Sequence, residues 1–68
     1  MKIYDNVEQT VNEWSKALMA KHGTTFRRYG SIKETLNMWS GRLAKLYGKP
    51  FSMQETLEET ISNWSKLF

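Results

Sequence analysis

The chain has no cysteine, one proline and one histidine, and no long apolar run among its 68 residues. The lack of cysteine excludes disulfides, thiolate zinc sites and iron–sulfur clusters, and it fits a cytoplasmic protein. Without a long apolar run we expect no membrane span, and the Met1 end lacks the charged and apolar regions of a signal peptide. We therefore expect one small cytoplasmic domain over residues 1–68, stabilised by packing, a partner or formation of a homodimer.

Groups that could carry chemistry are equally scarce. His22 has no second histidine or cysteine with which to share a metal, and Asp5 is the only aspartate available to a nucleophilic triad. Glu55 and Glu59 are one helical turn apart, but acidic side chains are typical of the first turn of a helix. We therefore expect a protein that is not an enzyme, with no catalytic residue, no metal and no cofactor.

Internal similarity is the strongest feature that is present. Residues 7–15 read VEQTVNEWS, residues 32–40 read IKETLNMWS, and residues 57–65 read LEETISNWS, each copy 25 residues after the last. A period of this length is typical of repeated supersecondary units. Because Thr, an aliphatic residue, Trp and Ser keep their places in all three copies, one alignment predicts the helix starts, the buried face and the loops together.

The aligned columns contain helix start and stop signals. Asn6, Ser31 and Thr56 share one column and are followed three residues later by Gln or Glu, which is the capping-box pattern. Gly23 and Gly48 suit the left-handed position just past a helix end. These signals predict helices near 6–22, 31–47 and 52–68.

Two of these starts are ambiguous by about a turn. Asp5 with Glu8, and Ser52 with Glu55, form competing caps for the first and third helices.

Apolar residues recur with the helical period in each predicted helix. The stripes are Val7, Val11, Trp14 and Leu18; Ile32, Leu36, Trp39, Leu43, Leu46 and Tyr47; and Leu57, Ile61, Trp64 and Phe68. Amphipathic helices with short connections must bury their stripes against one another, so we predict an all-α fold, a compact three-helix bundle. We expect Phe26 and Phe51 at the ends of the core, and Met19 and Met38 at the surface.

Charge is distributed unevenly along the chain, whose net charge is +3. The net charge is +2 over residues 1–30, +3 over residues 31–50 and −2 over residues 51–68. A basic part of this kind indicates an anionic partner.

The long predicted loop holds the best candidates for contact with such a partner. Arg27 and Arg28 precede Tyr29, and arginine pairs with carboxylate or phosphate while an aromatic ring can stack on a base. The predicted partner-binding residues are Arg27, Arg28, Tyr29, Met38, Arg42 and Lys45.

These features lead to three functional hypotheses. The first is a small non-enzymatic binding protein, a regulator or inhibitor that occupies the surface of a larger protein with an acidic patch. The second is nucleic-acid binding by the same basic loop and the middle helix. The third is a structural or self-associating helical bundle.

Overall fold

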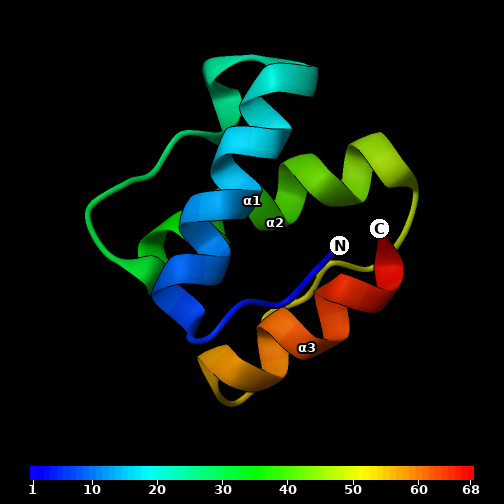
Figure 1. Ribbon diagram of the computed structural model, residues 1–68. Coiled ribbons are helices and arrows are strands. Elements are labelled where there is room, and N and C mark those ends of the chain that lie inside the picture. Colours follow the sequence, from blue (N-terminus) through cyan, green and yellow to red (C-terminus); the bar gives the residue numbers. More distant parts are fainter.

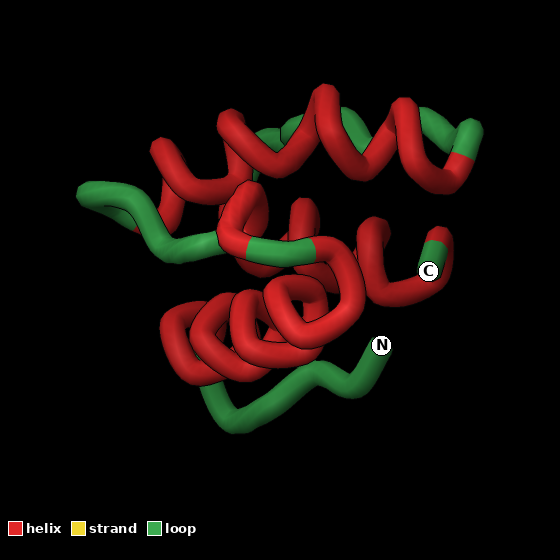
Figure 2. The backbone as a smooth tube through the Cα atoms, turned by 90° about the horizontal axis from the view of Figure 1, so that it is seen from above, coloured by secondary structure: helices red, strands yellow, loops and turns green.

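Three α-helices form the regular structure in the computed structural model, which describes all of residues 1–68 (Figure 1). They are α1 (Val7–His22), α2 (Ile32–Tyr47) and α3 (Leu57–Leu67), and a short 3-10 helix, η1 (Thr24–Phe26), follows α1. In Figure 1 α1 runs roughly vertically and the other two helices run across it, and Figure 2 shows the same three helices from above. The extents are nearly equal, at 25 × 22 × 22 Å, so the predicted compact all-α bundle of three helices is confirmed.

Side-chain caps start each helix in the predicted column. The cap oxygen accepts a hydrogen bond from the backbone N–H three residues later, in the pairs Asn6–Gln9 (2.8 Å), Ser31–Glu34 (3.1 Å) and Thr56–Glu59 (3.0 Å). Gly23 and Gly48 end the first two helices with φ values of 91° and 64°, which glycine adopts without steric strain. The three caps fix the register of the apolar stripes.

The predicted start of the third helix at residue 52 is wrong, because α3 begins at Leu57. The segment before it lies against its own helix instead. The backbone N–H of Gln54 donates to Thr60 Oγ1 (2.9 Å), and the indole N–H of Trp64 donates to the carbonyl of Ser52 (2.9 Å). Ser52 therefore belongs to the connection rather than to a helix, and the competing cap with Glu55 is not used.

The same hydrogen bonds recur before all three helices, at a spacing of 25 residues. A buried threonine hydroxyl accepts from a backbone N–H six residues earlier, at 2.9 Å, in the pairs Tyr4–Thr10, Tyr29–Thr35 and Gln54–Thr60. Each hydroxyl also donates to the carbonyl of the helix cap, at 2.7–2.8 Å. Because a buried N–H without a partner is costly, these threonines hold the segment before each helix in place.

The tryptophans lie in the core, as the stripes predict. Trp14, Trp39 and Trp64 are at most 1% exposed, and their indole N–H groups donate to the carbonyls twelve residues earlier. Phe26 packs edge-to-face on Trp39 (ring centroids 5.9 Å apart), and Phe51 packs on Trp64 in the same way (5.6 Å). The core therefore joins each connection to the helix that follows it.

One member of the predicted stripe is not buried. Leu46 is 53% exposed, whereas Leu43 and Tyr47 pack into the core. On a helix with 3.6 residues per turn, Leu46 lies at the edge of the stripe that Leu43 and Tyr47 define, and it borders an open hollow. Met38 is exposed as expected (41%), whereas Met19 is partly buried against the core.

Candidate partner-binding surface

The backbone before α2 determines which way the candidate side chains point. Arg27 has extended dihedral angles (φ −68°, ψ 164°); its carbonyl accepts the indole N–H of Trp39 (3.2 Å), and the N–H of Tyr29 is bound by Thr35. Successive side chains of an extended segment point to opposite sides. Arg27 and Tyr29 consequently lie on one side of the loop, and Arg28 lies on the other.

Five of the six predicted residues form what we call the basic surface. It consists of Arg27, Tyr29, Met38, Arg42 and Lys45. Met38 and Arg42 are four residues apart on α2, and Arg42 and Lys45 three apart, which places them on one helical face. Arg42 joins this face to the loop, because its Nη1 donates to the hydroxyl of Tyr29 (2.9 Å).

Two arginines hold the ring of Tyr29 between them. The guanidinium carbon of Arg27 lies 4.5 Å from the centroid of the Tyr29 ring, a cation–π distance. Arg42 binds the hydroxyl of Tyr29 and also donates to the carbonyl of Thr25 (2.6 Å) in η1. The planar guanidinium of Arg42 therefore connects α2, η1 and the loop.

Arg42 also changes the acidity of the phenol. Its hydrogen bond to the Tyr29 hydroxyl, followed by the positive charges of Arg42 and Arg27, lowers the pKa of Tyr29 below 10.0, although desolvation opposes the shift. A lowered pKa means that the folded state stabilises the ionised form of the phenol relative to the unfolded state. Its contribution to stability is therefore present above the unfolded pKa and is lost as the pH falls through the folded pKa.

Arg42→Gln is expected to raise the pKa of Tyr29 toward 10.0 by removing the charge and the stronger donor. A pH titration of the Tyr29 ring carbon by NMR measures this pKa. Arg27→Gln is the control and should produce a smaller rise, because the Arg27 contribution is smaller. A pKa that does not move in Arg42→Gln would show that this hydrogen bond is not formed in solution.

Carboxylates do not neutralise the basic surface. The only ion pair in the chain joins Lys16 and Glu13 on α1 (3.3 Å). Arg27 and Arg42 instead contact a ring, a phenol and a carbonyl, and Lys45 is exposed. Three cations therefore lie on one surface without an acidic partner from this chain.

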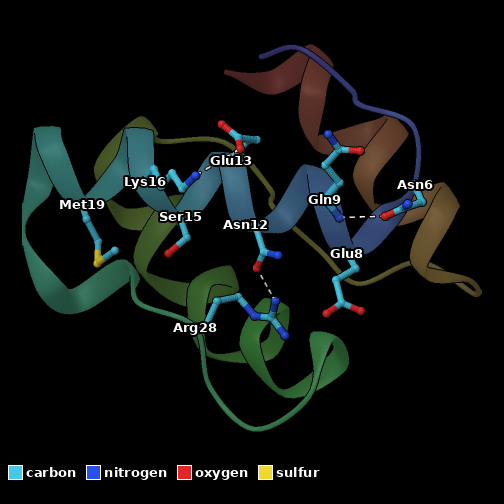
Figure 3. Close-up of a pocket in the computed structure, with 9 residues that line it drawn as sticks. All are labelled: Asn6, Glu8, Gln9, Asn12, Glu13, Ser15, Lys16, Met19 and Arg28. Atoms are coloured by element: carbon cyan, nitrogen blue, oxygen red, sulfur yellow. Dashed lines mark hydrogen bonds and ion pairs between the residues drawn. The ribbon is translucent and has the colours of Figure 1, made fainter.

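Arg28 does not belong to this surface, so its grouping with Arg27 and Tyr29 is corrected. Its Nη1 donates to the side-chain oxygen of Asn12 on α1, and its Nε has no partner. Figure 3 shows Arg28 reaching toward Asn12 across an open hollow of about 640 Å³ whose lining includes the carboxylates of Glu8 and Glu13. Those carboxylates disfavour an anion beside Arg28.

His22 lies in the last turn of α1, as expected. Its Nε2 is 3.5 Å from the hydroxyl of Tyr47, and its ring packs against Phe26 (centroids 5.6 Å apart). No group of three or more histidine, cysteine, aspartate or glutamate side chains is placed to hold a metal ion. Its contacts with Tyr47 and Phe26 give His22 a packing role at the junction of α1 and α2.

Sequence reasoning missed two features beside the basic surface. The carbonyl of Thr25 binds Arg42, and the exposed side chain of Leu46 borders a hollow next to Arg42. The position of Leu46 at the edge of the α2 stripe was the available signal. No sequence signal indicated the contact with the carbonyl of Thr25, because that contact depends on how η1 meets α2.

None of the helices has the length and apolar composition needed to cross a bilayer. Comparison of the chain with protein-family models, curated proteins and solved structures gave no significant match. A functional proposal therefore depends on the residues and geometry of the basic surface.

Proposed function

We propose that this chain is a small non-enzymatic binding protein that attaches through its basic surface to an acidic patch on a larger protein. By covering that patch it would act as a regulator or inhibitor. The observation that carries the proposal is that Arg27, Arg42 and Lys45 have no carboxylate partner within the chain. Charged side chains arranged in this way favour encounter with a surface of opposite charge.

Preorganisation supports the same proposal. Tyr29 orients Arg27 through its ring and Arg42 through its hydroxyl. Side chains that are already ordered lose less conformational entropy on binding, so more of the interaction energy appears as affinity. Tyrosine and arginine are also among the residue types enriched at the energetic centres of protein interfaces.

Nucleic-acid binding remains the second candidate, because the same cations could contact phosphates. The contacts of Tyr29 argue against this candidate, because they leave its ring poorly placed to stack on a base. Arg27 covers one face of its ring, and Arg42 binds its hydroxyl. The third candidate, self-association, predicts a sedimentation coefficient that rises with concentration, whereas the leading proposal predicts a monomer.

Affinity capture from lysate of the source cells separates the first two candidates. The immobilised chain is expected to retain a protein both with and without nuclease treatment, and to release it as the salt concentration rises. If nuclease treatment removes all retained material, the chain binds nucleic acid and the leading proposal is wrong. A gel-shift titration with random-sequence duplex DNA tests the second candidate directly, because phosphate contacts would give an affinity that falls steeply with salt. A flat salt response would count against nucleic-acid binding.

A further inference from the structure

A small hollow lies beside Arg42, where the end of α1, η1 and the second half of α2 meet. We call it the α2 hollow. Its volume is about 320 Å³, and its lining residues are His22, Thr25, Phe26, Arg42, Lys45 and Leu46. This volume is at the small end of the range of about 300–1,000 Å³ typical of ligand pockets. It suits one side chain of a partner better than a whole small molecule.

The α2 hollow combines apolar walls with a cationic rim. Phe26 is 1% exposed, and Leu46, at 53%, is the most exposed large hydrophobic side chain in the chain. Arg42 is held at the rim by the carbonyl of Thr25, and Lys45 makes no hydrogen bond and no ion pair. An accessible apolar side chain, Leu46, and two cations without an acidic partner, Arg42 and Lys45, therefore lie within about one turn of α2.

We infer that the α2 hollow receives a leucine or phenylalanine side chain from an acidic peptide segment of the partner, with flanking carboxylates paired to Arg42 and Lys45. The inference rests on the proposed function and names the chemistry of the segment that is bound. Charge complementarity supports this occupant, because a purely apolar segment would leave both cations unpaired, and a purely acidic one would leave Leu46 and the hollow exposed to water.

Arg42 determines where a carboxylate of the partner would bind relative to the α2 hollow. Its guanidinium already donates to Thr25 and Tyr29 through Nη1, which leaves its remaining N–H donors for a carboxylate. A carboxylate at this position would lie at the junction of the basic surface and the α2 hollow. The apolar anchor and the acidic residue of the partner would therefore be close neighbours in its sequence.

Two matched peptides test the inference. Both alternate Glu and Gly around one central residue, which is Leu in the first and Ser in the second, and each carries a fluorescent label for anisotropy titration. The Leu peptide is expected to bind the native chain about tenfold more tightly than the Ser peptide, since that factor corresponds to partial burial of one leucine side chain. Leu46→Ser should reduce the ratio to about twofold by removing one wall of the hollow.

Ile3→Ser is the matched control, because Ile3 is an aliphatic side chain of similar exposure (47%) in a different hollow, beside Asp5 and Glu58. It should leave the tenfold preference intact. Equal binding of the two peptides would overturn the apolar anchor while leaving the basic surface as a site. Absence of binding by both peptides would count against the proposed function itself.

A second copy of the chain is the competing occupant of the α2 hollow, and sedimentation of the unliganded chain tests this alternative. Ile3 with Asp5 and Glu58 presents an aliphatic side chain beside carboxylates, which a second copy of the chain could offer to the α2 hollow. We expect a monomer at every concentration. Self-association that both Leu46→Ser and Ile3→Ser abolish would assign the α2 hollow to a second copy and overturn the peptide inference.

Discussion

Trp39→Ala is expected to remove most of the stability of the fold and to lower its melting temperature toward room temperature. Trp39 is fully buried, its indole N–H donates to the carbonyl of Arg27 (3.2 Å), and its ring packs on Phe26. Replacing a buried aromatic residue with alanine costs about 3–5 kcal/mol of unfolding free energy. The total free energy of unfolding of a disulfide-free domain of this size is about 5 kcal/mol, at the low end for folded proteins. Far-UV circular dichroism measures the loss of helix.

Trp39→Phe separates the two roles of Trp39. Phenylalanine keeps an aromatic ring against Phe26 but loses the donor to the carbonyl of Arg27. The variant should therefore stay helical and melt at a lower temperature, because the loss is about 1–3 kcal/mol for the carbonyl left without its partner. A Trp39→Ala variant that melts close to the native temperature would disprove the central role assigned to this side chain.

The start of α3 shows what the repeated sequence could have predicted. Ser52 and Glu55 form as good a local capping pair as Thr56 and Glu59, so propensity alone could not choose between them. The aligned column could have chosen, because Asn6 and Ser31 both cap their helices and stand in register with Thr56. What decides the choice physically is the hydrogen bond from Gln54 to Thr60, which requires an extended segment.

The candidate site was predictable in part. The helical face shared by Met38, Arg42 and Lys45 follows from their spacing on α2, whereas the contact of Arg42 with η1 depends on how two helices cross. Arg28 could have been separated from Arg27 by the alternation of side chains, but only once the segment is known to be extended. Sequence spacing therefore predicts neighbours within an element better than neighbours between elements.

Arg27→Glu combined with Lys45→Glu is expected to weaken binding to the captured protein at least about 100-fold, because each change replaces an attraction to the acidic partner with a repulsion. Both side chains are exposed, and that of Arg27 contacts only the side chain of Tyr29, so far-UV circular dichroism should change little. Arg42 is left in place because it binds Thr25 and Tyr29.

Lys16→Glu combined with Lys66→Glu is the charge-matched control. Each double variant changes the net charge from +3 to −1, since every replacement of a cation by glutamate changes it by two. Lys16 and Lys66 are exposed on α1 and α3, outside the basic surface, and the pair between Lys16 and Glu13 contributes little to stability. Titration of both double variants with the captured protein therefore separates a localised site from a general effect of charge, and equal weakening by the two variants would rule out the basic surface as the site.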